Sequence, residues 1–435
     1  MDRLLMKKLI MWKESPRRKP LILNGARQVG KTWLLKEFGK LSFDKVAYIS
    51  LDNDAIARSL FERDFDVARM ISDLSLHSGI QITPDDTLII IDEIQACPKA
   101  ITSLKYFCED ASEYAVAAAG SLIGLSAHEG SGYPVGKVDE LNLYPLSFRE
   151  FLDATGNTML KELFDSKNID SMDSFAPKAV DLLRKYYVVG GMPAAVDAFS
   201  QGAELSEVRK IQTDILDGYE RDFAKHAPSR ILSRMMEAWE SIPSHLAQEN
   251  RKFIFGHIRE GARAKDYEQA LMWLAQAGLI IKVPRIVKPG LPLSSYNDNK
   301  SFKVYLLDVG LLGAMSGLEP STVVDGNTVF TEFKGALTEQ YVCQQLVSDC
   351  GKRPFYWSAE NSIGEIDFLV QEAGRIVAIE VKAEENVKSK SLHAFKEKYP
   401  EVFALRLSLS LFREQEWMRN VSLYALTNTW LWGVS

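Results

Sequence analysis

The sequence has few cysteines and no long apolar run. The four cysteines, Cys97, Cys108, Cys343 and Cys350, form no CxxC pair and no metal-binding spacing with the six histidines. This pattern argues against a disulfide framework and indicates reduced thiols. No apolar stretch reaches the roughly 20 residues of a membrane-spanning helix, and the basic N-terminal segment lacks the apolar core of a signal peptide. We therefore expect a cytoplasmic protein that does not contact a membrane.

An excess of positive charge is also missing. The chain has 52 lysines and arginines against 58 acidic residues, which gives a net charge of -6. Any contact with DNA or RNA must then come from a local basic patch. The 435 residues are too many for one ordinary hydrophobic core, so several domains are expected.

The clearest motif is GARQVGKT, which follows a short apolar strand and opens an amphipathic helix. This is the G-x-x-x-x-G-K-T pattern of a phosphate-binding loop in its strand–loop–helix setting. The loop aims backbone N–H groups at phosphate oxygens, and the helix N-terminus attracts the anion. Lys31 can reach the β- and γ-phosphates of ATP, and the Thr32 hydroxyl can ligate Mg²⁺. The predicted ATP-binding residues of this motif are Gly25, Ala26, Arg27, Gln28, Val29, Gly30, Lys31 and Thr32.

Further strands predict the sheet that carries this loop. Residues 88–91 are fully apolar and end in Asp92 and Glu93. Asp92 can hold Mg²⁺ through water, and Glu93 can orient and activate the attacking water. A third buried strand ends at Ser121, which could sense the γ-phosphate or simply precede a turn. With a further strand at 45–53, the pattern predicts an α/β fold: a doubly wound parallel sheet with the nucleotide at its carboxyl edge.

The GKT loop paired with a strand ending in Asp-Glu resembles the AAA-type ATPase superfamily. Three further segments are similar to sequences of a widespread prokaryotic family: GKVDELNLYPLSFREFL (136–152), YYVVGGMPAAV (186–196) and YERDFAKH (219–226). That family joins an AAA-type ATPase domain to a C-terminal domain of unknown function, and the resemblance covers essentially the whole chain. It implies ATP and Mg²⁺ as cofactors and allows an oligomer.

The resemblance also raises the question of an arginine that reaches a phosphate from a neighbouring subunit. Lys137 stands where the family is expected to have arginine, and lysine lacks the bidentate fork of the guanidinium group. Arg149, Arg221 and Arg230 remain candidates for this role. A surface or interdomain salt bridge is the alternative for each of them, and for any single arginine it is the favoured one.

The middle of the chain changes in character twice. Residues 157–174 are polar and indicate an irregular connection, and the helical patterns that follow indicate a lid interrupted by GGMP (190–193). From residue 229 onward, helices precede a strand pair at 280–287 and 293–307, which resembles a winged helix. Between residues 248 and 288 there are eight basic and four acidic residues. That excess permits DNA contact, and packing between domains is the alternative.

The segment GEIDFLVQEAGRIVAIEVKA (364–383) reads as a hairpin that turns at Ala373-Gly374. A two-residue turn places Asp367 opposite Glu380 and Glu365 opposite Lys382 on one face of the hairpin. Facing carboxylates repel each other, and a divalent cation between them would remove the repulsion. Carboxylate oxygens are the ligands that Mg²⁺ prefers.

This hairpin resembles the PD-(D/E)XK nuclease fold. The helix at 333–347 carries Glu339, RPFYWSA supplies a first strand, and a helix and a strand follow the hairpin. The resemblance implies catalytic roles for Asp367, Glu380 and Lys382, with Glu339 as a further metal ligand beside Asp367 and Glu380. A salt bridge between Glu365 and Lys382, with the other acids solvated at an edge, is the alternative.

Together these patterns predict four parts. They are an AAA-type ATPase domain (1–156), a helical lid or connector (157–228), a winged-helix-like domain (229–318) and an α/β restriction-endonuclease-like domain (319–435). The leading hypothesis is Mg²⁺-dependent ATP binding and hydrolysis coupled to a DNA or RNA transaction. The rival is an ATP-dependent switch or scaffold whose nuclease-like domain is an inactive binding surface. A small-molecule kinase is a weaker third hypothesis, since no second substrate pocket can be named.

Overall fold

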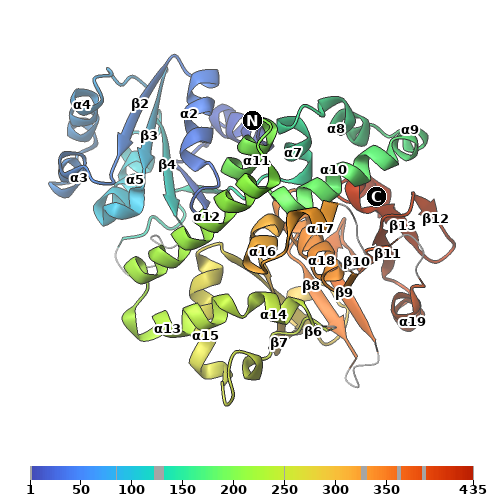
Figure 1. Ribbon diagram of the computed structural model, residues 1–435. Coiled ribbons are helices and arrows are strands. Elements are labelled where there is room, and N and C mark those ends of the chain that lie inside the picture. The colour runs from blue at the N-terminus through green and yellow to red at the C-terminus, as the bar shows by residue number, and fades with distance from the viewer. Residues whose placement is uncertain are drawn as a thin grey trace. The chain divides into compact units, whose positions relative to one another are not determined.

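The computed structural model of the protein (Figure 1) describes residues 2–84, 86–121, 132–248, 250–324, 331–359, 364–384 and 388–434. The side chains of residues 121, 299, 331 and 332 are outside this description. The chain divides into two compact units. The N-terminal unit contains Asp2–Tyr144 with Gln276–Gly278, and the C-terminal unit contains Pro145–Ala275 with Leu279–Ser435. The boundaries predicted after residues 156, 228 and 318 all fall inside the C-terminal unit.

The N-terminal unit is built on a five-stranded sheet in the order β2-β3-β4-β1-β5. All neighbouring strands are parallel. The strands are β1 (Leu21–Gly25), β2 (Lys45–Ser50), β3 (Thr87–Asp92), β4 (Ala115–Ser121) and β5 (Asp139–Asn142). β1 and β3 are buried along their whole length, as expected for central parallel strands covered on both faces. The parallel α/β sheet predicted from the sequence is confirmed.

Helices cover both faces of this sheet, with α2 on one face and α3, α4 and α5 on the other (Figure 1). Because side chains alternate along a strand, Ile49, Ile91 and Ala118 all join the core on the α3–α5 side, where they meet Phe61 and Leu104. The helices of this unit are α1 (Leu5–Glu14), α2 (Lys31–Ser42), α3 (Ala55–Glu62), α4 (Val67–Ser78), η1 (Ile94–Ala96) and α5 (Pro98–Asp110).

The C-terminal unit contains an eight-stranded sheet in the order β12-β13-β11-β10-β9-β8-β6-β7. The strands are β6 (Ile280–Ile286), β7 (Asn297–Leu306), β8 (Phe355–Ser358), β9 (Glu365–Glu372), β10 (Arg375–Val381), β11 (Phe403–Ser408), β12 (Arg413–Glu414) and β13 (Arg419–Ser422). β6 pairs with β7 as an antiparallel hairpin and also with β8 in parallel. The hairpin predicted as a wing is therefore part of the C-terminal sheet, because β8 takes up the free hydrogen-bonding edge that an isolated hairpin would expose.

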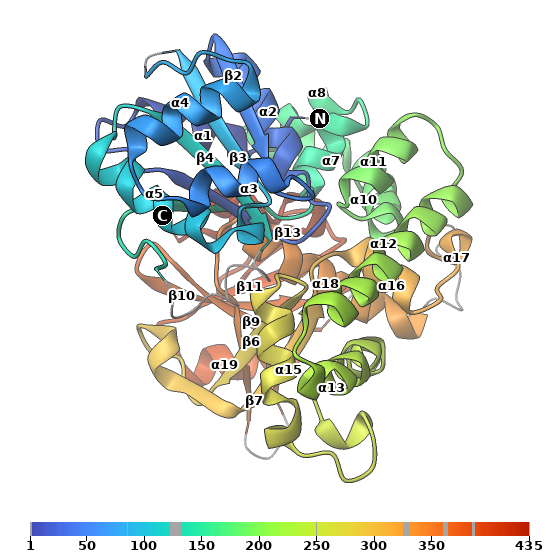
Figure 2. The same cartoon turned by 90° about the vertical axis from the view of Figure 1, so that its left-hand side faces the viewer.

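Two helices cover opposite sides of this sheet, α18 (Thr331–Ser348) and α19 (Lys390–Lys398) (Figure 2). α19 contributes Leu392 and Phe395 to a core with Leu369 and Ala378. The order of elements from α18 through β8, β9, β10 and α19 to β11 is the α-β-β-β-α-β order predicted from the sequence.

The remaining helices lie mostly before this sheet in the chain. Residues 158–165 and 169–174 form α8 and α9, so the irregular connection predicted for 157–174 is wrong. Leu160 and Phe164 lie one turn apart and are buried, a narrow apolar stripe that the polar composition obscured. The helices are α7 (Phe148–Ala154), α8 (Thr158–Asp165), α9 (Ile169–Ser174), α10 (Ala176–Val189), α11 (Pro193–Ser200), α12 (Leu205–His226), α13 (Ser229–Glu240), α14 (Ile242–Leu246), η2 (Phe255–His257), α15 (Ala264–Gln276), η3 (Leu293–Tyr296), α16 (Val309–Met315), α17 (Pro320–Val324), η5 (Leu423–Ala425) and η6 (Thr429–Trp432).

Candidate nucleotide site and buried carboxylate cluster

The GARQVGKT loop joins β1 to α2, as the motif predicts. Gly30 has a φ of 94° where the loop enters α2, and Gln28 is also left-handed with a φ of 65°. A Cβ on Gly25 would lie 2.4 Å from the Leu143 carbonyl oxygen, so the close approach of backbone there requires glycine. Ala26 and Val29, two other residues of the loop, are buried. The loop therefore has the tight backbone that points N–H groups toward a bound anion.

Lys31 begins α2 and folds back over the loop. Its Nζ donates hydrogen bonds to the carbonyl oxygens of Gly25 (3.0 Å) and Ala26 (2.9 Å). Burial lowers the pKa of Lys31 to about 8, against the opposing effect of the Glu93 and Asp92 carboxylates. The buried ammonium group of Lys31 has only two neutral carbonyl oxygens as partners. A bound anion would therefore stabilise its charge more strongly than these carbonyls do. Lys31 is thus placed to bind a phosphate group.

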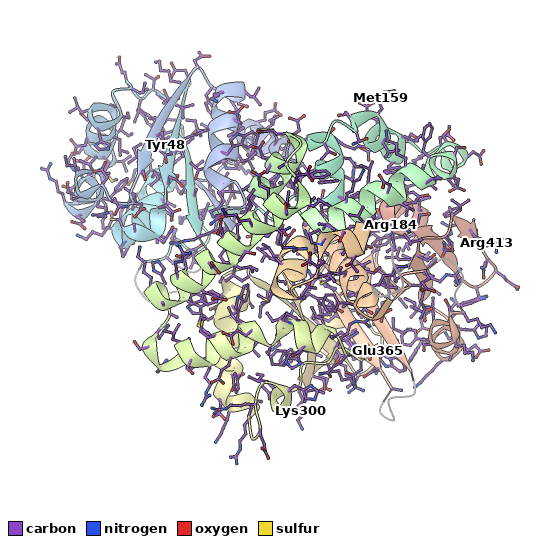
Figure 3. All side chains as sticks on the ribbon, in the orientation of Figure 1. Tyr48, Met159, Arg184, Lys300, Glu365 and Arg413 are labelled. Atoms are coloured by element: carbon purple, nitrogen blue, oxygen red, sulfur yellow. The ribbon has the colours of Figure 1, made fainter. Side chains whose placement is uncertain are left out.

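Asp92 lies beside Thr32, as a shared magnesium site requires. The Thr32 hydroxyl donates to Asp92 Oδ2 at 2.9 Å, and the Tyr48 hydroxyl donates to the same oxygen at 2.8 Å. Burial and the Asp92 carboxylate raise the pKa of Tyr48 to about 12, so this hydroxyl stays a donor at neutral pH. A hydroxyl and a carboxylate oxygen fit Mg²⁺. Tyr48 (labelled in Figure 3) was not among the predicted site residues, although its strand was predicted.

Glu93 follows Asp92 in a strained backbone conformation. Its φ is 52°, which is unusual for a residue with a Cβ and is common at functional positions. Gln95 Nε2 donates to a Glu93 carboxylate oxygen and holds the side chain. Ser121 pairs with Gly25 along the β1–β4 ladder, so its backbone reaches the same edge of the sheet. The predicted role of Ser121 concerns a side chain outside the described part of the structure.

Four basic residues were considered for contact with a phosphate of a neighbouring subunit, and their surroundings differ. Lys137 forms an ion pair with Glu109 at 2.8 Å in the N-terminal unit. Arg149 contacts Asp165 and lies 3.6 Å from Asp349. Arg221 and Arg230 are exposed, and Arg221 is 3.9 Å from Asp217. Which arginine meets a phosphate stays a prediction.

In the C-terminal unit, three predicted acids meet two unpredicted bases. We call this group the buried carboxylate cluster, and it consists of Glu339, Glu365, Asp367, Lys303 and Arg251. Lys303 is fully buried and lies 2.5 Å from Glu365 Oε1 and 3.7 Å from Glu339 Oε2. Arg251 Nη1 lies 2.6 Å from Glu339 Oε1. The cluster therefore contains its own positive charges, which buried carboxylates require.

The hairpin register is the predicted one over most of its length. Glu372 pairs with Arg375, and the ladder continues in step to Phe368 and Ile379. Beyond that point the Asp367 carboxylate accepts a hydrogen bond of 2.7 Å from the Val381 N–H. Asp367 thus bonds the backbone of β10 where the prediction placed its side chain facing Glu380.

Asp367 carries a shifted pKa. Burial raises it above the usual range, the Glu339 carboxylate raises it further, and Lys303 opposes both. The pKa of Glu339 is lowered instead, because Arg251 and Lys303 outweigh its burial. The Asp367 carboxyl group is within hydrogen-bonding reach of Glu339. A proton on Asp367 shared with the Glu339 carboxylate fits both shifts.

Glu380 and Lys382 form a separate ion pair at the end of β10. Lys382 Nζ is 3.2 Å from Glu380 Oε1, so Lys382 pairs with Glu380, and Glu365 pairs with Lys303. Glu380 is only 4% exposed, and its Oε2 has no hydrogen-bond partner among the described residues. Glu380 also pairs with Arg406 of β11 in the strand register.

The cluster does not fit the metal site expected from Asp367, Glu380 and Glu339. Within the described ranges, no group of three or more histidine, cysteine or acidic side chains is arranged to hold a metal ion. Both oxygens of Glu339 have partners, since Tyr305 donates to Oε2 at 3.0 Å and Arg251 contacts Oε1. Because side chains alternate along a strand, the sequence places Lys303 and Tyr305 on the same face of β7. That spacing was the sequence signal that could have indicated their shared contact with Glu339.

The described helices contain no segment that is both long and apolar enough to cross a membrane.

Three segments of the chain match known family models. Residues 17–152 match the model of an AAA domain. Residues 180–322 and 334–423 match two separate domains of unknown function. An uncharacterized protein of Methanocaldococcus jannaschii is 24% identical over 224 residues, which is 48% of this chain and 45% of that protein. The chain thus spans less than half the length of this curated relative.

Solved structures give weaker likenesses. A Walker-type ATPase of Pyrococcus abyssi has a TM-score of 0.45 at 13% identity, over 72% of this chain and 95% of the other. The Cdc6p structure of Pyrobaculum aerophilum has a TM-score of 0.26 at 13% identity, over 75% and 96% of the two chains. The AAA match over residues 17–152, together with the loop and sheet around Lys31, supports an AAA-type ATPase domain in the N-terminal unit.

Proposed function

We propose that the protein binds and hydrolyses ATP with Mg²⁺ in its N-terminal unit. The observation that carries this proposal is the assembly of Lys31, Thr32 and Asp92 at one edge of the parallel sheet, with Thr32 bonded to Asp92 at 2.9 Å. The match of residues 17–152 to an AAA domain supports it. The four cysteines are free thiols, which fits a cytoplasmic location.

The residues divide the chemistry among them. Lys31 binds the β- and γ-phosphates and stabilises the negative charge that develops there. Thr32 and Asp92 would hold Mg²⁺, which neutralises phosphate charge when bound. Glu93 orients the attacking water, and Gln95 holds the Glu93 carboxylate in place through a hydrogen bond. Glu93 therefore acts on the chemical step, and Lys31 acts on both binding and chemistry.

Comparing two variants tests this assignment. Lys31→Ala should abolish both binding of a fluorescent ATP analogue and release of phosphate. Glu93→Gln should keep binding and slow phosphate release by a factor of about 100 or more. Normal ATP binding by Lys31→Ala would show that the site is misplaced. Normal turnover by Glu93→Gln would remove Glu93 from its assigned role.

We further propose that the C-terminal unit takes part in a nucleic-acid transaction as a nuclease-like binding module. The observation in favour of binding over cleavage is the buried carboxylate cluster, where Lys303 and Arg251 already neutralise the acids. A second feature that supports contact with DNA or RNA is the set of exposed basic residues between 248 and 288: Arg259, Arg263, Lys265, Lys282 and Lys288. In this proposal α13–α15 and the β6–β7 hairpin form the winged-helix-like part.

A cleavage assay separates binding from catalysis. Single- and double-stranded DNA and RNA would be incubated with Mg²⁺ or Mn²⁺, with and without ATP. We expect bound but intact nucleic acid for both the wild type and Asp367→Ala. Cleavage by the wild type that is lost in Asp367→Ala would instead establish a nuclease and overturn the binding-module assignment.

A further inference from the structure

A cavity of about 1010 Å³ lies in the C-terminal unit between α10 and the segment that joins β11 to β12. Three arginines line it from three elements: Arg184 on α10, Arg406 on β11 and Arg413 on β12. Figure 3 labels Arg184 and Arg413 on their ribbons. No residue of the GARQVGKT loop lines the cavity, and neither the proposed ATP site nor the nuclease resemblance uses it.

One buried side chain holds the floor of this cavity in place. Asn420 is fully buried, and its Nδ2 donates to the carbonyl oxygens of Ser410 (3.2 Å) and Leu411 (2.9 Å). Its Oδ1 accepts from Arg406 Nε (2.8 Å) and from the Ser408 hydroxyl (2.8 Å). Asn420 therefore fixes both the loop after β11 and the orientation of the Arg406 guanidinium group. A site fixed before its ligand arrives costs less free energy to occupy.

The charges around the cavity leave two arginines available. Among the described residues, no side-chain hydrogen bond or ion pair engages Arg184 or Arg413. The neighbouring acids are taken by other bases, since Asp181 pairs with Lys185 at 2.9 Å and Glu414 pairs with Arg419 at 2.5 Å.

Asp173 is the remaining acid that lines the cavity. The lining therefore contains two acids, Asp173 and Asp181, against three arginines. The cavity thus presents a net positive lining to an anion.

We propose that this cavity binds a phosphate-bearing ligand of nucleotide size, either a free nucleotide or a unit of a nucleic-acid strand. Guanidinium groups bind phosphate oxygens through paired, charge-assisted hydrogen bonds. Val180, Leu409 and Phe412 supply apolar lining on which a base can rest. The volume lies at the upper end of the range of ligand pockets.

The test uses the full chain with Lys31→Ala as background, so that the GARQVGKT loop does not contribute. One probe is a fluorescein-labelled oligothymidine of about ten nucleotides, followed by fluorescence anisotropy. The other is AMP, followed by titration calorimetry. The double variant Arg184→Gln with Arg413→Gln should lower the affinity for whichever probe the background protein binds, by at least about tenfold. Lys178→Gln is the matched control, an exposed base on α10 that does not line the cavity.

The two probes identify the source of the phosphate. Loss of oligothymidine binding in the double variant assigns the cavity to a nucleic-acid strand, and loss of AMP binding assigns it to a free nucleotide. Equal affinity of the double variant and the control overturns the proposal, and so does failure of the background protein to bind either probe. ATP turnover of the same substitutions without Lys31→Ala should match the wild type. A wild type without turnover would refute the ATPase and leave the cavity result standing.

Discussion

Lys303 is the residue on which the buried carboxylate cluster depends. It is fully buried and is the basic residue that reaches both Glu339 and Glu365. Without it, Arg251 alone opposes the acids, and an uncompensated buried charge is costly. The hairpin alone therefore does not decide what the acids do, because their charge balance comes from β7.

Lys303→Met should lower the free energy of unfolding by about 3–5 kcal/mol, the usual cost of breaking a buried ion pair from one side. Urea denaturation followed by circular dichroism measures this change. Lys185→Met is the control, because its ion pair with Asp181 is solvent-exposed and should be worth less than about 1 kcal/mol. Equal losses in the two variants would contradict the role given to Lys303.

Asp367 should make stability depend on pH. Its raised pKa means that the folded protein holds a proton that the unfolded chain releases. This contribution is fully present below about pH 4, the value of an unperturbed aspartate, and is lost as the pH rises through the folded pKa. Asp367→Asn cannot ionise, so its free energy of unfolding should fall less between pH 5 and pH 8 than that of the wild type. Identical pH profiles in thermal melts would show that Asp367 is already ionised in the folded protein.

At the scale of elements, local patterns were reliable where local physics sets the outcome. The turn at Ala373-Gly374 has φ values of 46° and 74°, the left-handed pair that a two-residue hairpin turn requires. The turn fixes the register, which is why the pairing of Glu372 with Arg375 could be predicted. The pairing near the start of β9 differs from the prediction, because the Asp367 side chain accepts a hydrogen bond from the backbone of β10 there.

The GGMP break between α10 and α11 has a packing reason as well as a conformational one. A Cβ on Gly191 would lie 2.1 Å from the Leu146 carbonyl oxygen and 2.8 Å from its nitrogen. The Gly191 N–H also donates to the buried Asp308 carboxylate at 2.6 Å. The break is therefore a contact point between distant segments of the C-terminal unit.

Gly191→Ala should destabilise the C-terminal unit by about 3 kcal/mol or more, since two backbone segments would have to separate. Gly256→Ala makes the same chemical change at a glycine with nothing within 4 Å of the new Cβ, so its effect should stay within about 0.5 kcal/mol. Melting temperatures of the two variants provide the comparison. A Gly191→Ala protein as stable as Gly256→Ala would show that the backbone there adjusts freely.

At the scale of the whole molecule, the chain consists of two compact units where the sequence predicted four parts. The boundaries predicted after residues 156, 228 and 318 fall inside the C-terminal unit, and its sheet includes β6 and β7 from before residue 318. Sequence patterns report where an element begins and ends. They do not report which later strand will pair with its free edge.

Nucleotide binding should raise the thermal stability of the N-terminal unit, which contains the proposed ATP site. Calorimetry of the full chain is expected to show two thermal transitions, and a non-hydrolysable ATP analogue should raise the melting temperature of one. At a hundredfold excess over the dissociation constant the stabilisation should be about 2.7 kcal/mol. Lys31→Ala should abolish the shift. A single transition would mean that the units unfold together, and a shift that persists in the variant would place the nucleotide elsewhere.

The phosphate loop, the parallel sheet around it and the register of the hairpin turn were all predictable from the amino-acid sequence. Each of these follows from neighbouring residues: glycine conformations, strand alternation and the spacing of one motif. Tertiary structure decided that Tyr48 joins Asp92, that Lys303 and Arg251 neutralise the acids, and that Asn420 organises an arginine-lined cavity. These contacts join residues far apart in the chain. A charged group is stabilised by whichever partner the fold brings near, and sequence spacing does not encode that distance.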